Sequence, residues 1–426
     1  MSSPPSEALG SRSHPPLDYG QAEDWLLGLE LFGMDFGTGR MRRLLARLGD
    51  PQSRFAAIHV VGSNGKSSTV RITEAILRAQ GTPSGAYLSP HLTSWTERVL
   101  VGGRPVSGER FSRAASEVAA AAEAEDRSGQ GGPVTQFEAL TAIAFVLLAE
   151  AGVRVAVVEA GLGGRLDATN VIGAPVVACT SVGLEHAAVL GDTVAEIAIE
   201  KLDVVGPGAT LVVPADLPPD ALEVAVRRTS ATGARMVVAP RSSPLAPKGT
   251  APYLSHNLAL AAAAAHAYLG ALDEAAVSRA LEAGALEIDG RFQPVGERPL
   301  TILDGAHNPD GARALAAAIG SGALPGPVVA CMAVLDDKDA AGMIEALRPR
   351  VDRFVFTSCS HPRSLSAEEL ARAAGDAGFE TVDGAHAALA RARSLAGPDG
   401  TALATGSLYL LAELGREPGS GPGATL

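Results

Sequence analysis

Short runs of apolar, often β-branched residues alternate along the chain with longer Ala- and Leu-rich segments. The runs predict strands at residues 57–61, 153–159, 176–182, 210–213, 300–303, 327–334, 354–357 and 402–404. Apolar runs without polar alternation are typical of strands buried on both faces, and the segments between them are long enough for helices. The pattern therefore predicts an α/β protein whose parallel sheets are covered by helices.

Two domains are expected, because 426 residues exceed what one hydrophobic core usually organises. The polar segment PVGERP, at residues 294–299, precedes a fresh apolar run and predicts a boundary between domains at 17–296 and 297–414. The Pro/Ser-rich residues 1–16 and the Gly-rich tail 415–426 are predicted to be flexible. Residues 126–132 are predicted to form a loop, and the Ala-rich stretch 258–268 a buried helix.

Charge and composition exclude several classes of protein. The formal net charge of −12 offers no broad attraction for nucleic acid or an anionic membrane surface. No apolar run is long enough to span a bilayer, and the N-terminus lacks the apolar core of a secretory signal. The three cysteines are far apart and suit a reducing compartment. We therefore expect a cytoplasmic monomer that binds neither nucleic acid nor membrane.

The most informative local pattern lies at residues 57–69, which read AIHVVGSNGKSST. A strand, a Gly-rich turn and a helix beginning near Lys66 would point backbone N–H groups and a helix N-terminus at one spot, which suits a polyphosphate. Lys66 could reach the outer phosphates, and Ser67 offers a hydroxyl. The match to the general phosphate-loop pattern is partial, since Val60 stands where that pattern has its first glycine. An ordinary strand–turn–helix connection with a surface lysine would show the same local pattern.

Polar residues at the ends of other predicted strands suggest a metal site. Glu159 ends one strand, His186 follows another, and Ser89 lies in the segment LSPHL. Oxygen ligands with a supporting histidine would suit magnesium. Each residue alone also fits a solvated surface position, so only their joint placement beside the predicted phosphate loop favours a metal site. Lys201, late in an amphipathic helix, equally fits a surface lysine.

Seven segments stand in one order: GSNGKSST, LSPHL followed by TERV, TQFEALTA, VVEAGLGGRLDATNVI, TSVGLEHAAVLGDT, LDGAHNPDGA and TGSLYLL. Together they resemble the folylpolyglutamate synthase / dihydrofolate synthase family of the Mur ligase superfamily, from about Tyr19 to about Glu413. The resemblance implies a phosphate-loop ATPase domain followed by a smaller Rossmann-like domain, with substrates between them. Among the departures from the family pattern are Ser63 for threonine and Glu185 for aspartate.

The resemblance also implies the roles of individual residues. ATP would be held by Gly62, Ser63, Asn64, Gly65, Lys66, Ser67 and Ser68, and from the inter-domain side by Asn257, Arg291, Asp304 and His307. One magnesium ion would be held by Ser89, Glu159 and His186, and a second would be assisted by His186 and a carbamate on Lys201. A pterin pocket would include Thr135, Phe137, Asp167 and Ala168, and the incoming glutamate would lie near Ser407 and Tyr409. The residues expected to act in catalysis are Lys66, His186, Lys201, Asp304 and His307.

The activity implied is ATP-dependent ligation of L-glutamate to a folate-type acid in folate biosynthesis, through an acyl phosphate, with release of ADP and phosphate. Whether the acceptor is tetrahydrofolate, dihydropteroate or both stays open. The same motifs are compatible with a Mur-type ligase for a different acid acceptor, although only about 55 residues precede the phosphate loop, too few for a UDP-binding domain. They are also compatible with a phosphate-loop regulatory ATPase and with a catalytically inactive homologue.

Overall fold

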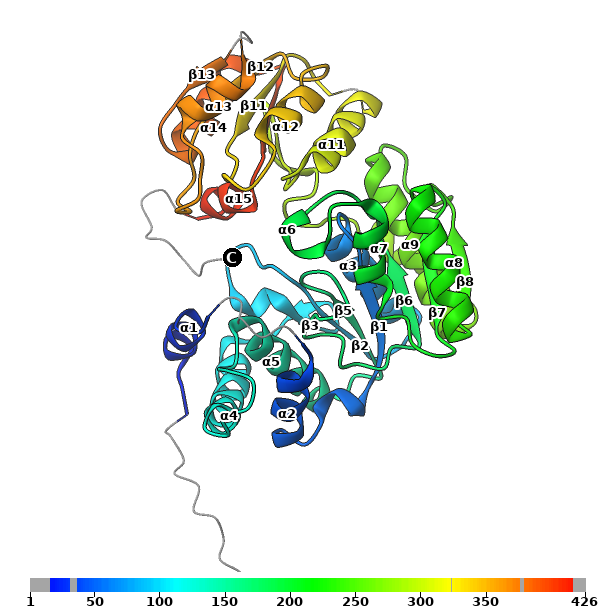
Figure 1. The fold of residues 1–426 in the computed structure, drawn as a ribbon. Helices are drawn as coiled ribbons and strands as arrows, with labels where there is room; N and C mark the ends of the chain where they lie inside the picture. Colours follow the sequence, from blue (N-terminus) through cyan, green and yellow to red (C-terminus); the bar gives the residue numbers. More distant parts are fainter. Residues whose placement is uncertain (1–15, 31–36, 323, 376–378, 417–426) are drawn as a thin grey trace, which may run out of the picture.

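The computed structural model describes residues 16–30, 37–322, 324–375 and 379–416, which form two α/β domains (Figure 1). The two terminal segments that the sequence predicts to be flexible lie almost entirely outside the described residues. The first domain is built on an eight-stranded sheet of order β4-β3-β2-β5-β1-β6-β7-β8. Its strands are β1 (Ala56–Val61), β2 (Ser84–Tyr87), β3 (Val99–Val101), β4 (Arg104–Pro105), β5 (Val155–Glu159), β6 (Val176–Cys179), β7 (Thr210–Pro214) and β8 (Arg235–Ala239).

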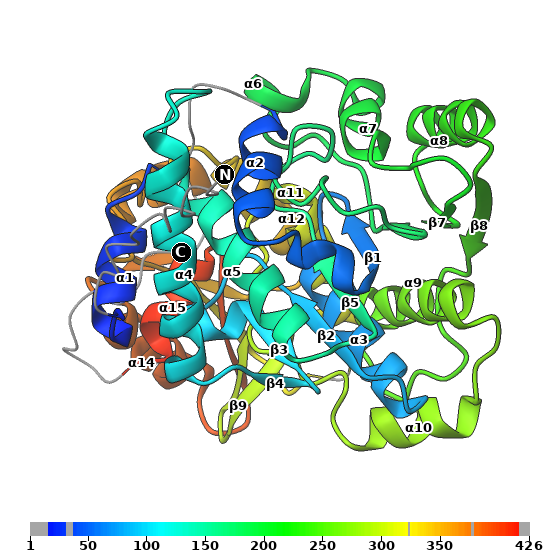
Figure 2. The ribbon, with the colours of Figure 1, turned by 90° about the horizontal axis from the view of Figure 1, so that it is seen from below.

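The first sheet has β1 near its centre, paired in parallel with β5 on one side and β6 on the other. Only β3 and β4, at one edge, run antiparallel to their neighbours. Helices cover both faces, as the unbroken apolar runs predict. One face packs against α3 (Lys66–Ala79), α9 (Pro252–Leu269) and α10 (Glu274–Glu282). The other packs against α1 (Tyr19–Leu27), α2 (Gly39–Arg47), α4 (Gly108–Asp126), α5 (Gln136–Glu150), α7 (Val194–Leu202) and α8 (Pro219–Thr232) (Figure 2).

The predicted Ala-rich helix is confirmed as α9. Small side chains let it lie close to α3, β6 and β7, and α11 of the second domain also contacts it. The remaining short elements of this domain are α6 (Ala187–Leu190) and two 3₁₀ helices, η1 (Pro51–Arg54) and η2 (Trp95–Arg98).

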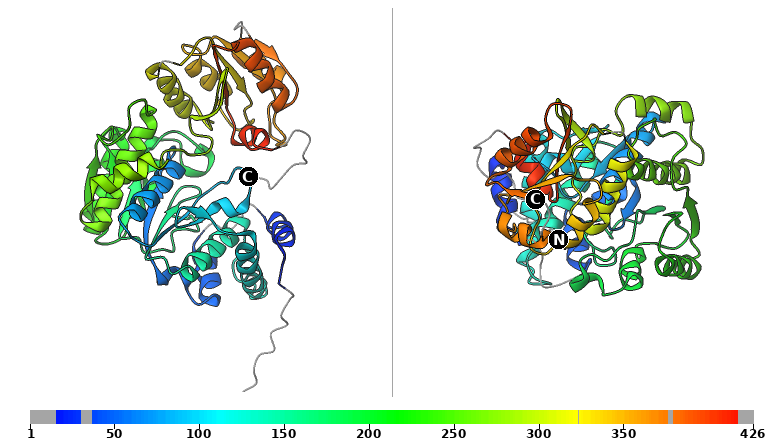
Figure 3. Two further views of the ribbon diagram at one scale, coloured as in Figure 1. Left: turned by 180° about the vertical axis from the view of Figure 1, so that it is seen from behind. Right: turned by 90° about the horizontal axis from the view of Figure 1, so that it is seen from above.

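The second domain has a six-stranded sheet of order β13-β12-β11-β14-β10-β9. Its strands are β9 (Gln293–Glu297), β10 (Leu300–Leu303), β11 (Val328–Met332), β12 (Arg353–Phe356), β13 (Phe379–Thr381) and β14 (Thr401–Thr405). On one face lie α11 (Pro309–Ser321), α12 (Ala340–Leu347) and α13 (Ala367–Ala374). On the other lie α14 (Ala385–Ala396) and α15 (Leu408–Leu414), of which α15 faces the first domain (Figure 3).

The structure corrects the expected domain boundary. Residues 293–297 form strand β9, which pairs antiparallel with β10, so the second sheet already begins at Gln293. The segment resembles a linker because its glycine, prolines and charges break the apolar pattern, and an edge strand tolerates these residues. The strands β2, β3, β4, β8 and β13 were not predicted either. Strands β2, β3, β4 and β13 are four residues or shorter, and β8 is partly exposed.

Among the described residues, no helix has the length and apolar character needed to cross a membrane.

Candidate active site

The turn after β1 requires glycine at two positions. Gly62 and Gly65 have φ values of 140° and 87°, which side chains disfavour. A Cβ atom at Gly62 would lie 2.1 Å from Thr180 Oγ1, and one at Gly65 would lie 2.6 Å from Asn257 Oδ1. The turn is therefore packed between the end of β6 and helix α9, where Asn257 contacts it.

The loop 62–65 leads directly into α3, as predicted for a phosphate-binding turn. Ser63 N donates to Ser181 O at 2.9 Å, and Asn64 N donates to Ser181 Oγ at 2.9 Å. Lys66 Nζ donates to the carbonyl oxygens of Gly62 at 3.0 Å and Ser63 at 3.1 Å, so the ammonium group lies over the turn. A cation over a glycine-rich helix N-terminus is an arrangement that binds phosphates. Ser68, in the first turn of α3, is buried.

Glu159 lies between Ser67, which is expected to hold ATP, and Ser89, which is expected to hold magnesium. Its Oε1 accepts a hydrogen bond from Ser67 Oγ at 2.9 Å, and its Oε2 accepts one from Ser89 N at 3.1 Å. Burial raises the pKa of Glu159, and the charge of Lys66 opposes that rise. The Glu159 carboxylate and the Ser67 hydroxyl are oxygen ligands of the kind that magnesium prefers, so this cluster fits a magnesium ion next to bound phosphates.

Arg98 supports this cluster and was not singled out from the sequence, although it lies in the TERV segment. Its side chain is buried, with Nη1 donating to Ser89 Oγ at 3.1 Å and Nε donating to His91 Nδ1 at 2.9 Å. The guanidinium also lies 5.2 Å from the centre of the Trp95 ring. Because Arg98 holds the hydroxyl group of Ser89, it orients an expected metal ligand.

Lys201 is buried, with only 1% of its surface exposed, so it is not the surface lysine that the sequence left open. Its Nζ donates to Gly62 O at 3.0 Å and to Glu185 Oε1 at 3.1 Å. Asp203, a neighbour in sequence that could have paired with Lys201, instead pairs with Arg228 at 2.8 Å. Burial lowers the pKa of Lys201, the charge of Lys66 lowers it further, and Glu185 opposes both. Lys201 therefore joins α7 to the first residue of the phosphate loop.

The ion pair between Lys201 and Glu185 predicts a pH effect on stability. Burial alone would raise the pKa of Glu185, but Lys66 and Lys201 outweigh it and lower the pKa to about 2 from an ordinary 4.5. Since the folded pKa lies below the unfolded one, this stabilisation is present above about pH 4.5 and is lost as the pH falls toward 2. Over that window the unfolding free energy of the wild type should fall by about 2 kcal/mol more than that of Glu185→Gln.

Urea denaturation at stepped pH would measure the difference. Glu223→Gln, which alters an exposed glutamate on α8, is the matched control and should follow the wild type. Parallel curves for Glu185→Gln and the wild type would show that the ion pair does not stabilise the fold.

His186 does not join the Glu159 cluster in this structure. It has a positive φ of 48° and an exposed side chain, and partial desolvation and the charge of Lys338 lower its pKa. Within the described residues no group of three or more His, Cys, Asp and Glu side chains is placed to hold a metal. The structure thus brings Ser67, Ser89 and Glu159 together, whereas the second expected metal site, around His186 and Lys201, stays a prediction.

The second domain contributes Asp304, at the end of β10. Its Oδ2 accepts hydrogen bonds from Tyr253 Oη at 2.6 Å and from Phe292 N at 2.9 Å, and its Oδ1 accepts one from Ala306 N at 3.0 Å. Tyr253 belongs to α9 of the first domain. Oδ2 of Asp304 therefore links the two domains, whereas Oδ1 is engaged within the second domain. Burial raises the pKa of this carboxyl group.

His307 and Arg291 lie beside Asp304. His307 Nδ1 lies 2.8 Å from Gly305 O, and burial lowers the pKa of its ring to about 4. The ring is consequently neutral near pH 7, with Nδ1 as the donor and Nε2 left to accept. Arg291 Nη1 donates to Gly290 O at 2.9 Å, and its charge lowers the pKa of Asp304 in the second domain and of Glu159 in the first.

One direct contact joins the phosphate loop to the second domain. Asn64 Nδ2 donates to Asn308 Oδ1 at 3.3 Å, and Asn308 Nδ2 donates to Asn64 Oδ1 at 3.0 Å. Asn308 is also the N-cap of α11, where its Oδ1 accepts from Gly311 N at 2.8 Å. Two residues 244 positions apart thus form a reciprocal amide pair, which places the N-terminus of α11 against the loop.

The predicted acceptor pocket lies on the loop after β5. The ring of Phe137 packs so closely on Gly161 that a Cβ there would lie 2.5 Å from its Cζ atom. Asp167 is buried, and its Oδ2 accepts from Leu162 N at 2.9 Å. Thr135 is the N-cap of α5 and shares a capping box with Glu138, and Ala168 is buried beside Asp167. Phe137 and Asp167 are therefore brought to the same loop.

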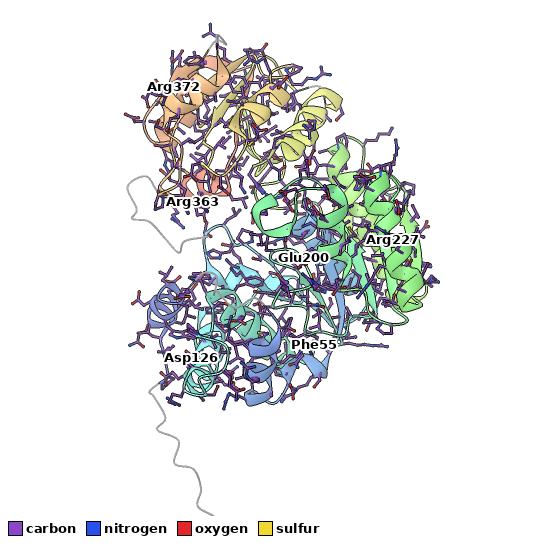
Figure 4. All side chains as sticks on the ribbon, viewed as in Figure 1. Phe55, Asp126, Glu200, Arg227, Arg363 and Arg372 are labelled. Atoms are coloured by element: carbon purple, nitrogen blue, oxygen red, sulfur yellow. The ribbon has the colours of Figure 1, made fainter. Side chains whose placement is uncertain are left out.

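Ser407 and Tyr409 lie at the start of α15, on the side of the second domain that faces the first. Ser407 caps this helix, and Tyr409 packs against His361 with the two rings tilted and their centres 4.1 Å apart. Arg363 lies on the same side, beside α15 (Figure 4). Lys338 follows β11, and its charge lowers the pKa values of His186 and His307. Lys338 was not singled out from the sequence, because one lysine among the acidic residues of LDDKD carries no distinctive signal.

Comparison with known proteins agrees with this geometry. The family model described as Mur ligase, glutamate ligase domain, matches residues 290–408. The dihydrofolate synthase/folylpolyglutamate synthase of Mycobacterium tuberculosis is 34% identical, over 80% of this chain and 78% of that protein. A Haloferax volcanii protein named probable bifunctional folylpolyglutamate synthase/dihydropteroate synthase is 36% identical over 93% of this chain. This chain spans 50% of the length of that protein.

Solved structures give the same result. Mycobacterium tuberculosis folylpolyglutamate synthase complexed with ADP superposes with a TM-score of 0.85 at 32% identity, covering 94% of this chain and 99% of that one. A bifunctional folylpolyglutamate synthase/dihydrofolate synthase with Mn, AMPPNP and L-glutamate bound superposes with a TM-score of 0.80 at 30% identity, covering 94% and 98%.

A phosphate-loop domain joined through Asn64 and Asn308 to a smaller Rossmann-like domain defines a Mur-type ligase, a class that forms carbon–nitrogen bonds. Within this class, the chain belongs to the folylpolyglutamate synthase / dihydrofolate synthase family.

Proposed function

We propose that this chain uses ATP to join L-glutamate to the free carboxyl group of a folate-type acid. The observation that carries the proposal is the meeting of the phosphate loop with the segment 304–308 of the second domain, at the Asn64–Asn308 pair. A nucleotide held by the loop would have its outer phosphates beside residues of both domains. A regulatory ATPase would have no need of a second domain placed in this way.

The chemistry requires activation of the acceptor, because a carboxylate resists attack by an amine. Transfer of the γ-phosphoryl group from ATP to the carboxylate gives an acyl phosphate, and attack by the glutamate amine then gives the amide and releases phosphate. Positioning and neutralisation of charge dominate such a reaction. Lys66 would hold the outer phosphates, and the loop's N–H groups would orient them. The neutral ring of His307 leaves Nε2 free to accept a hydrogen bond from the approaching ammonium or amine.

Ser67, Ser89 and Glu159 would hold magnesium, which neutralises phosphate charge when it is bound. A second magnesium and a carbamate on Lys201 belong to the same proposal. The burial that lowers the pKa of Lys201 supports them, because it favours the neutral amine, the form that takes up carbon dioxide. His186 would have to turn toward Lys201 to complete that second site.

The acceptor and the incoming glutamate are assigned to residues of different domains. Phe137 and Asp167, on the first domain, would contact the pterin ring of the acceptor. Ser407, Tyr409 and Lys338, on the second domain, would face the incoming glutamate, whose two carboxylates a lysine can pair with. Dihydropteroate and tetrahydrofolate are both proposed as acceptors.

The direct test is incubation of the full chain with ATP, magnesium and glutamate, offering dihydropteroate and tetrahydrofolate in separate reactions. We expect mass spectrometry to show a product heavier than the acceptor by one glutamyl residue, with one ADP formed per amide. Formation of ADP should depend on both acceptor and glutamate. ADP formed equally well without them would favour a regulatory ATPase, and acceptor-dependent ADP only with another carboxylic acid would favour a different Mur-type ligase.

A further inference from the structure

A buried histidine in the central strand has no part in the chemistry described so far. His59 is on β1, three residues before Gly62, and none of its surface is exposed. Its Nε2 lies 2.8 Å from Thr169 Oγ1. Thr169 Oγ1 in turn donates to Asp167 Oδ1, and Thr169 N donates to the same oxygen at 2.9 Å. A continuous chain of hydrogen bonds therefore runs from the central strand to the Asp167 carboxylate.

The donor and acceptor in each of these hydrogen bonds follow from the chemistry of the three side chains. Thr169 Oγ1 donates its single hydrogen to Asp167 Oδ1, which also accepts from Thr169 N. Thr169 Oγ1 must then accept from His59, which places the hydrogen of the neutral ring on Nε2. Nδ1 is left bare, and it is buried with no hydrogen-bond partner among the described residues. Burial lowers the pKa of His59 to about 4, so the ring keeps one hydrogen near neutral pH.

These hydrogen bonds leave the Asp167 carboxylate little freedom to rotate. Its Oδ1 receives two hydrogen bonds from Thr169, and its Oδ2 receives one from Leu162 N. The ring of Phe137 packs on Gly161, one residue before Leu162. An aromatic face near a fixed carboxylate suits a flat heterocycle that carries N–H donors.

We propose that His59 and Thr169 are positioning residues that hold the Asp167 carboxylate in the orientation needed to bind the ring of the acceptor. The inference rests on the proposed function, and it adds two residues to the acceptor site. It differs from a purely structural role, in which the same hydrogen bonds would only anchor the loop to the sheet and would leave acceptor binding unchanged.

Two matched pairs of variants of the full chain separate these roles. His59→Leu removes the donor, whereas His59→Gln keeps an N–H that can reach Thr169. Thr169→Val removes the hydroxyl at constant shape, whereas Thr169→Ser keeps it. The KM for the acceptor should rise about tenfold in His59→Leu and Thr169→Val, and should stay within about twofold in His59→Gln and Thr169→Ser.

The turnover number at saturating acceptor and the KM values for ATP and glutamate should not change. The reason is that the ring of the acceptor is remote from the reacting carboxyl group, so its contacts contribute equally to the ground state and the transition state. The double variant His59→Leu/Thr169→Val should show little more than the effect of either single change, because both break the same chain.

The proposal is overturned if His59→Leu and Thr169→Val lower the melting temperature while the acceptor KM is unchanged. It is also overturned if the KM for ATP rises as much as that for the acceptor, since the effect would then pass through the phosphate loop. If His59→Leu fails to fold, Thr169→Val decides the question, because it removes one hydroxyl from a loop. Absence of any glutamyl product from the wild type, with ADP still bound in calorimetry, would instead contradict the proposed function.

Discussion

Replacing Lys66 with alanine is expected to lower ligase turnover by about 100- to 1,000-fold, the usual loss when one preorganised charge-stabilising group is removed. Lys66 is the only cationic side chain between Gly62 and Ser68, and its ammonium group lies over the turn, bonded to Gly62 O and Ser63 O. Without it, the negative charge that moves onto the outer phosphates during transfer would be met only by backbone N–H groups. The fold should survive, because the hydrophobic core does not depend on this side chain.

Steady-state assays of amide formation, with circular dichroism to confirm folding, would measure the effect. Lys248→Ala is the matched control, since Lys248 is exposed on a loop between β8 and α9. The control should keep wild-type turnover. A Lys66→Ala variant with near-normal turnover would show that the turn after β1 does not bind the reacting phosphates.

Replacing Lys201 with alanine should reduce turnover to a comparable extent, because its Nζ is the link between α7 and Gly62. Removing the side chain would leave the buried carboxylate of Glu185 without its 3.1 Å partner and would release the first residue of the loop. Lys201→Met keeps most of the buried volume and should lose activity as well, which separates the loss of the amine from the effect of a cavity.

Recovery of activity on addition of acetate distinguishes a carbamate on Lys201 from a plain ammonium group. If a carbamate on Lys201 supplies an oxygen ligand, added acetate should restore part of the turnover of Lys201→Ala. A crystal grown with bicarbonate should then also show the carbamate. Neither rescue nor carbamate density would leave Lys201 as an ammonium group paired with Glu185 and Gly62. In that case Glu185→Gln should lower turnover in the same direction.

Much of the fold can be predicted from the sequence, because it follows from local patterns of apolar and polar residues. Buried parallel strands need apolar residues on both faces, so the runs that became β1, β5, β6, β7, β10, β11, β12 and β14 could be predicted with small errors at their ends. The turn at residues 62–65 was equally visible, because glycines before a helix with a lysine have a local physical reason. The edge strand β9 could not be predicted, because a strand that pairs with a neighbour on one side only does not need a run of apolar residues.

The sequence by itself determined the α/β class, the phosphate loop and, through its ordered motifs, the family. Only the tertiary structure decided that Lys201 is buried against Gly62, that Arg98 holds Ser89, and that Asn64 pairs with Asn308. It also left the side chain of His186 exposed and without a hydrogen bond to Glu159. The physical reason is that the periodicity of apolar residues reports how each segment is buried. It carries no information on which distant polar groups will meet, because that depends on how the two sheets and their helices pack together.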